Sequence, residues 1–104
     1  MAGGRHPKQI ADYTRALEFE VNDASIFFGR GAARQKKNDL EGALADYSKA
    51  IELDQSHALA YASRGVVKVL LQKSDYAADF ETAFRLDPSL RASYSKFYEN
   101  RRRP

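Results

Sequence analysis

A ten-residue phrase recurs three times along this chain. Residues 11–20 read ADYTRALEFE, residues 45–54 read ADYSKAIELD and residues 78–87 read ADFETAFRLD. Successive copies begin 34 and 33 residues apart, and ASIFFGRGAA at 24–33 aligns in the same way with ALAYASRGVV at 58–67. Repetition at this period is typical of a solenoid, in which each unit buries its apolar face only against its neighbours. We therefore expect a stack of similar units.

The units are expected to be helical. In residues 40–53 the apolar side chains recur at spacings of three and four, which is one face of a helix. Asp39 can cap the start of this helix, and Asp87-Pro88 ends the equivalent helix of the next unit. The pattern predicts an all-α fold with helices at about 7–20, 24–37, 39–53, 57–72, 75–86 and 89–101.

Composition and charge narrow the classes of protein that fit. The chain has 104 residues, 43% of them hydrophobic and 30% charged, which is the size and balance of one globular domain. It has no cysteine, which fits a reducing compartment. Its first residues lack the apolar run of a secretory signal, and no apolar stretch is long enough to span a membrane. We expect a cytoplasmic protein with no membrane insertion and with residues 1–6 disordered.

The alternation of two helix types resembles the tetratricopeptide repeat. The first type carries aromatic-x-x-Arg-Gly, and the second carries Ala-Asp-aromatic-x-x-Ala, over about residues 10–99. The resemblance implies a right-handed superhelical α-solenoid of antiparallel helix pairs, forming a single domain over 7–101. Its parts would be a half repeat at 7–20, repeats at 24–55 and 58–88, a capping helix at 89–101 and then a basic tail at 102–104. The positions that match the family's structural residues are Phe27, Gly31, Ala43, Tyr47, Ala50, Tyr61, Gly65, Phe80, Ala83 and Pro88.

Two positions depart from the family pattern. Tyr76 stands where Ala is expected, because the second unit is one residue short near its turn. Tyr98 stands where the first-type helix has its small residue, which argues against close crossing by another helix there.

The resemblance also implies a binding site for a protein or peptide, because the first-type helices of the family line a concave groove. The groove positions are Ser25, Phe28, Ala32, Gln35 and Lys36 in the first unit, and Leu59, Ala62, Val66, Val69 and Leu70 in the second. The wholly apolar second set would accept a hydrophobic helix or strand. The alternative is that Val66, Val69 and Leu70 complete the core of a small solenoid. Family members that hold a chaperone's C-terminal carboxylate have Lys and Asn where this chain has Phe28 and Ala32, so that activity is not expected.

The opening helix presents an apolar face formed by Ile10, Tyr13, Leu17 and Phe19. In a complete unit the equivalent residues are covered by a preceding first-type helix as well as by the next unit. Leaving about 150 Å2 of such surface in water would forfeit roughly 4 kcal/mol. We therefore expect a partner to cover this face, and a second chain in a homodimer is the commonest closed solution. Self-assembly is thus the alternative to peptide binding.

Catalytic chemistry is not expected. His6 and His57 are predicted to be solvated, and Gly31 and Gly65 lie inside helices rather than in a phosphate-binding loop. No metal ligands converge in the sequence, so we predict no enzyme activity, no metal and no cofactor.

Two sets of charged residues recur with the repeat. Arg30 and Arg64 are expected to pair with the aspartates of the second-type helices, which are Asp12, Asp46 and Asp79, with ligand capture by the arginines as the alternative. A basic edge formed by Arg34, Lys36, Lys37, Lys73 and Arg101 to Arg103 complements the helix dipoles. Nucleic acid binding there is not favoured, since acidic residues share the edge and no aromatic residue interleaves it.

Overall fold

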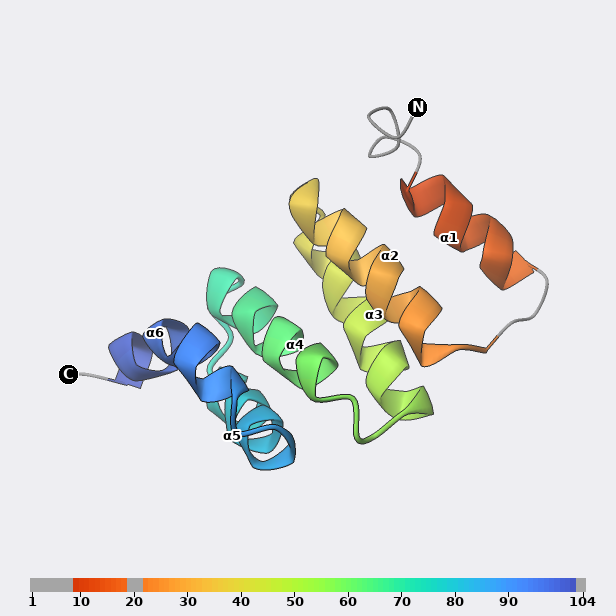
Figure 1. Ribbon diagram of the computed structural model, residues 1–104. Helices are drawn as coiled ribbons and strands as arrows, with labels where there is room; N and C mark the ends of the chain where they lie inside the picture. The colour runs from red at the N-terminus through yellow and green to blue at the C-terminus, as the bar shows by residue number, and fades with distance from the viewer. Residues whose placement is uncertain (1–8, 19–21, 103–104) are drawn as a thin grey trace.

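The computed structural model describes residues 9–18 and 22–102, with the side chains of 9, 16–18 and 99–102 excepted. The predictions for residues 1–6, Phe19, the Leu17 side chain, the side chains of residues 101–102 and residues 103–104 lie outside this description. Within the described residues six helices follow one another: α1 (Gln9–Glu18), α2 (Ala24–Lys36), α3 (Leu40–Leu53), α4 (Ala58–Leu70), α5 (Tyr76–Leu86) and α6 (Leu90–Arg102). Figure 1 shows α2 with α3 and α4 with α5 as two successive antiparallel pairs.

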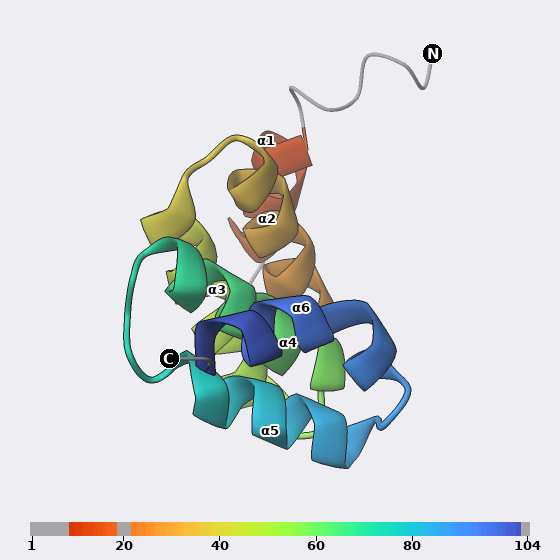
Figure 2. The same cartoon turned by 90° about the vertical axis from the view of Figure 1, so that its left-hand side faces the viewer.

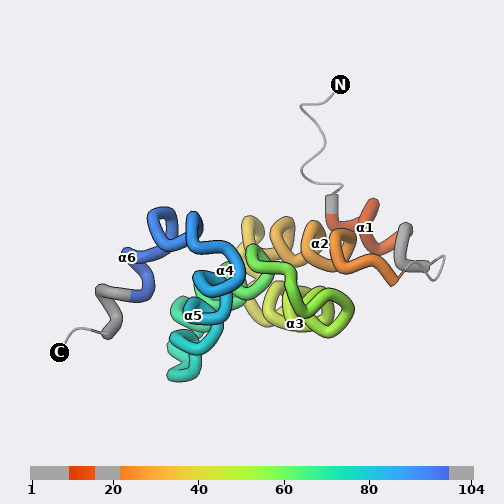
Figure 3. Tube along the Cα trace, turned by 60° about the horizontal axis from the view of Figure 1, so that its bottom comes forward, coloured from red at the N-terminus to blue at the C-terminus, as the bar shows by residue number. Residues whose placement is uncertain are grey.

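The helices form an elongated stack of 44 × 25 × 23 Å. Figure 3 shows α2, α4 and α6 on one side of the stack and α3 and α5 on the other. At one end α1 packs against α2, and at the other α6 crosses over α4 and α5 (Figure 2). The predicted all-α solenoid of helix pairs is therefore confirmed.

Both first-type helices of the complete pairs end in the same left-handed turn. Asn38 has a φ of 65° and Gln72 a φ of 61°. In each case the next amide reaches back into the helix, from Asp39 N–H to Arg34 O and from Lys73 N–H to Lys68 O, each at 2.8 Å. This satisfies carbonyls that would otherwise be orphaned at the helix end. It also explains why α2 and α4 end one and two residues earlier than the sequence pattern predicted.

Two glycines allow the helices of each pair to approach closely. A Cβ on Gly31 would lie 2.9 Å from the ring of Tyr47, and one on Gly65 would lie 3.0 Å from the ring of Phe80. Both rings are buried, at 1% and 0% exposure. Each glycine is thus the position at which a second-type helix places its aromatic residue against a first-type helix.

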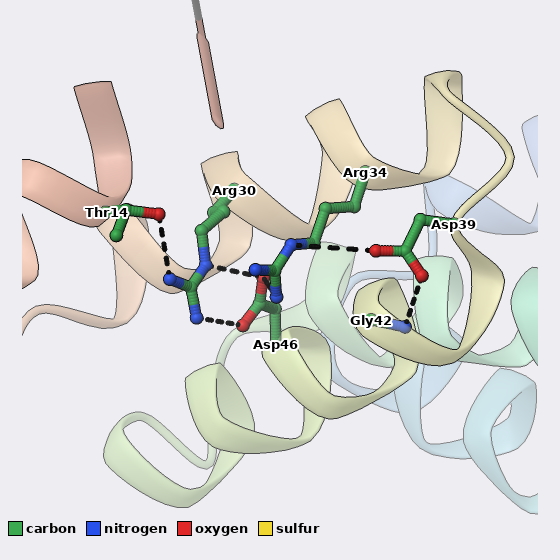
Figure 4. A network of polar contacts seen from close by, with 6 residues as sticks. All are labelled: Thr14, Arg30, Arg34, Asp39, Gly42 and Asp46. Atoms are coloured by element: carbon green, nitrogen blue, oxygen red, sulfur yellow. Dashed lines mark hydrogen bonds and ion pairs between the residues drawn. The ribbon is translucent and has the colours of Figure 1, made fainter. Parts of the chain in front are cut away.

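A buried aspartate joins the two helices of each pair. Asp46 on α3 accepts hydrogen bonds from Arg30 Nε at 2.9 Å and Nη2 at 2.8 Å, and from Arg34 Nη1 at 3.1 Å (Figure 4). Asp79 on α5 is bonded in the same way by Arg64, and Lys68 Nζ lies 3.1 Å from it. These hydrogen bonds to Asp46 and Asp79 raise the pKa of each arginine above its ordinary value, although burial opposes the shift. The internal salt bridges predicted from the repeat spacing are present in both complete pairs.

The arginines also join neighbouring units. Arg30 Nη1 donates to Thr14 Oγ1 of α1 at 3.1 Å, and Arg64 Nη1 donates to Ser48 Oγ of α3 at 3.3 Å. Each guanidinium therefore spans a partner in its own pair and one in the preceding unit. Planar guanidinium groups suit such bridging because their donors point in several fixed directions.

An aromatic cluster fastens α6 to the last pair. The ring of Phe80 has the rings of Tyr76, Phe84, Tyr94, Phe97 and Tyr98 around it, with centroids 5.9 to 6.5 Å away. Tyr98 Oη donates to Glu81 Oε2 at 2.7 Å. Glu81 stands where Thr14 and Ser48 stand in the earlier units. The bulky Tyr98 thus turns back onto α5, in keeping with its predicted departure from the family pattern.

Candidate functional site

One cavity among the described residues is a groove between α2, α4 and α6. Its volume is about 440 Å3, and it is lined by Phe28, Ala32, Gln35, Lys36, Tyr47, Ser63, Val66, Tyr94 and Phe97. We call it the central groove. It lies among the first-type helices, where the family resemblance places a binding surface.

The groove has apolar walls and a polar floor. Phe28 and Phe97 line it from opposite helices, and Phe97 is 37% exposed. Tyr47 reaches it from α3 and donates its hydroxyl to Gln35 Oε1 at 2.7 Å. Burial raises the pKa of Tyr47 to about 12, so the hydroxyl keeps its proton at neutral pH. The floor can therefore donate and accept hydrogen bonds, whereas the walls favour an apolar ligand.

The ten residues predicted to line a groove divide into three groups. Phe28, Ala32, Gln35, Lys36 and Val66 line the central groove. Ser25, Leu59 and Leu70 are exposed but lie outside its lining. Ala62 and Val69 are buried in the core with Phe80 and Phe84, because α5 and α6 cover that side of α4. The groove assignment is therefore wrong for both residues, and the alternative of core filling holds for Val69. Val66 is also buried, at 7% exposure, whereas Leu70 is 49% exposed.

Four lining residues were not predicted: Tyr47, Ser63, Tyr94 and Phe97. Tyr47 was identified as a structural residue, and its ring does lie in the core, but its hydroxyl reaches the floor. The presence of Tyr94 and Phe97 in the lining depends on how α6, which carries both, lies across the stack (Figure 2). The one available signal was the spacing of Tyr94, which stands 33 residues after Tyr61.

The predicted structural residues lie mainly in the core. Ala43, Ala50, Phe80 and Ala83 are completely buried. Phe27 packs with Tyr61 against the cluster formed by Ala50, Ile51 and Ala60. Pro88 lies in the turn between α5 and α6.

His57 is not the bare solvated side chain that the sequence suggested. It caps α4, because its Nδ1 accepts a hydrogen bond from the Ala60 amide at 3.2 Å. Its ring also lies 4.9 Å from the ring of Phe28. His57 is thus a structural residue that supports one wall of the central groove.

The predicted self-association face is partly covered by the chain itself. Ile10 and Tyr13 are half-buried, and the Tyr13 ring lies directly over Gly29 of α2. The homodimer remains a prediction.

The basic edge is partly neutralised. Arg34 bonds to Asp46 at 3.1 Å and lies 3.8 Å from Asp39, while Lys36, Lys37 and Lys73 are exposed.

Over the described residues, no group of three or more histidine or carboxylate side chains could hold a metal ion. No helix in that part of the chain has the length and apolar character needed to cross a membrane.

The helix pairs and the groove define a helical-repeat protein. A family model described as a TPR repeat matches residues 36–72. Among solved structures, the Arabidopsis OM64 TPR domain matches with a TM-score of 0.82 at 25% sequence identity, over 95% of this chain and 85% of that chain. None of the curated proteins compared with the chain matches it. The two matches support the assignment to the tetratricopeptide repeat (TPR) family that the sequence predicted. Domains of this family generally mediate protein–protein interactions and are generally non-catalytic scaffolds.

Proposed function

We propose that this chain is a non-catalytic protein-interaction module whose central groove holds a peptide or an amphipathic helix of a partner protein. The observation that carries the proposal is the groove itself, about 440 Å3 between three first-type helices. That volume lies in the range of ligand pockets, about 300–1,000 Å3, which are mostly apolar with a few placed polar groups.

The lining suggests the chemistry of the partner. An apolar side chain would pack among Phe28, Val66 and Phe97, where it would cover the exposed part of the Phe97 ring. A polar atom of the partner backbone would reach the half-buried side chains of Gln35 and Ser63. Lys36 is the one charged residue among the described lining residues, so a carboxylate beside the apolar anchor would suit it.

Filling the groove tests the proposal. Ala32 lines it, so Ala32→Phe should occupy the space while α2 stays helical. The matched control is Ala45→Phe on α3, where the alanine is exposed and does not line the groove. The probes are peptides selected from a phage-displayed library against the immobilised wild-type chain. We expect Ala32→Phe to weaken their binding by about tenfold or more and Ala45→Phe to leave it unchanged.

The opposite result is equally clear. Selected peptides that bind Ala32→Phe as tightly as the wild-type chain contact some other surface. The proposal would then be wrong even though the fold is unaltered.

A further inference from the structure

Asp12 on α1 belongs to a repeated set of aspartates but lacks the environment of the other two. Asp46 and Asp79 are 3% and 4% exposed, and each is bonded by an arginine and a second cation. Asp12 is exposed, and no cation among the described residues bonds to it. Since the three residues occupy the same place in the repeated phrase, the difference lies in what packs against the helix.

The partner of this aspartate has a defined chemistry in both complete pairs. An arginine bonds the carboxylate through Nε and Nη2, and a second cation follows four residues later, one helical turn on. The residue after each arginine is glycine, which admits the aromatic ring that follows the aspartate. The motif is therefore Arg-Gly-x-x-Arg in α2, with Arg30 and Arg34, and Arg-Gly-x-x-Lys in α4, with Arg64 and Lys68.

On its other side α1 is joined to the stack as a second-type helix should be. Thr14 accepts a hydrogen bond from Arg30 just as Ser48 accepts one from Arg64. The position of α1 relative to α2 thus repeats the position of α3 relative to α4 at this contact. The side of α1 that corresponds to the α2-facing side of α3 therefore has no helix packed against it among the described residues.

The residue after Asp12 supports this comparison. Tyr13 corresponds to Tyr47 and Phe80, whose side chains are almost completely buried. Tyr13 is only half-buried. An arriving helix would therefore cover apolar surface as well as neutralise a carboxylate.

We propose that α1 is the acceptor for a partner helix that carries Arg-Gly-x-x-Arg or Arg-Gly-x-x-Lys and docks beside Asp12 as α2 docks on α3. Charge complementarity selects this occupant. In a second copy of the chain, α2 and α4 already bond their own aspartates. The α6 helix of a second copy has Phe97 and Tyr98 at the arginine and glycine positions, and α1 against α1 would oppose two Asp12 carboxylates.

The test uses a labelled peptide of residues 22–38, which holds the α2 motif, titrated into the full chain and followed by fluorescence anisotropy. We expect saturable binding that Asp12→Asn weakens by about tenfold or more, because charge-assisted hydrogen bonds are lost. Arg30→Gln in the peptide should cost a similar factor, and the two changes together should cost little more than either alone. Glu41→Gln, which removes an exposed carboxylate from α3, is the matched control and should have no effect.

A second experiment is needed because a short free peptide is only weakly helical in water. The same segment is joined ahead of residue 1 by a flexible linker in the full chain. We expect the thermal unfolding midpoint of this fused chain to be higher than that of the unfused chain, and we expect Asp12→Asn to abolish the difference. Failure of both experiments, or an effect that is the same in Asp12→Asn, overturns the proposal. So does a wild-type homodimer that Tyr13→Glu dissociates and Asp12→Asn does not, since the face would then serve self-association.

Discussion

Replacing Asp46 by alanine should test most directly what holds a helix pair together. The carboxylate is 3% exposed and accepts three hydrogen bonds, two from Arg30 and one from Arg34. Removing one partner of a buried ion pair costs about 3–5 kcal/mol, because the other charge is left uncompensated. The side chains of Arg30 and Arg34 are 16% and 25% exposed and can turn toward water. We therefore expect a smaller loss of unfolding free energy, about 2–3 kcal/mol, once solvent screening is allowed for.

Urea unfolding followed by circular dichroism measures this loss as a lower midpoint at an unchanged slope. The control is Glu52→Gln, which removes an exposed carboxylate 3.5 Å from Lys49 on α3 and should change stability by less than about 0.5 kcal/mol. Substituting both Arg30→Met and Asp46→Leu should cost less than Asp46→Ala, because the more deeply buried Arg30 charge is then removed as well. The cation that still loses Asp46 is Arg34, which is 25% exposed and also lies 3.8 Å from Asp39. If Asp46→Ala costs no more than the control, the buried aspartate does not secure α2 against α3 and the reasoning is refuted.

Three further predictions concern single positions. Gly65→Ala should destabilise the chain by about 1–2 kcal/mol, since its Cβ would lie 3.0 Å from the buried Phe80 ring; a gain in stability, as helix propensity alone would give, would contradict this. Gln72→Gly should raise the unfolding free energy by about 0.5–1 kcal/mol, because the residue has a φ of 61°, which glycine adopts without strain. A lower melting temperature of the variant would show that the Gln72 side chain matters more than the backbone. The folded-state pKa of Tyr47 is raised to about 12, so the stability that this shift contributes should be complete below pH about 10 and lost as the pH rises toward 12. Tyr47→Phe should remove this pH dependence in alkaline unfolding titrations.

Local and repeated features of the sequence determined much of the fold. The spacing of apolar residues predicts the ends of the six described helices to within two residues. It can do so because amphipathic periodicity is a property of neighbouring residues. The recurrence of Gly31 and Gly65 with the aromatic residues of the second-type helices predicts the close helix crossings that the structure shows. Pairing of Arg30 with Asp46 follows from the same logic, since burying either charge alone would be costly.

The placement of α6 was decided by tertiary packing. Tyr98 occupies a position that is glycine in α2 and α4, and its ring packs back on Phe80 and Phe84. In that orientation α6 packs, together with α5, against the core cluster that holds Ala62 and Val69, and it brings Phe97 into the lining of the groove. His57 caps α4 through a local contact with the amide of Ala60, and only its contact with the Phe28 ring joins it to another helix. A sequence specifies which faces are apolar, but which of them a neighbouring helix buries depends on contacts between side chains far apart in the chain, and these are settled only when the helices pack together.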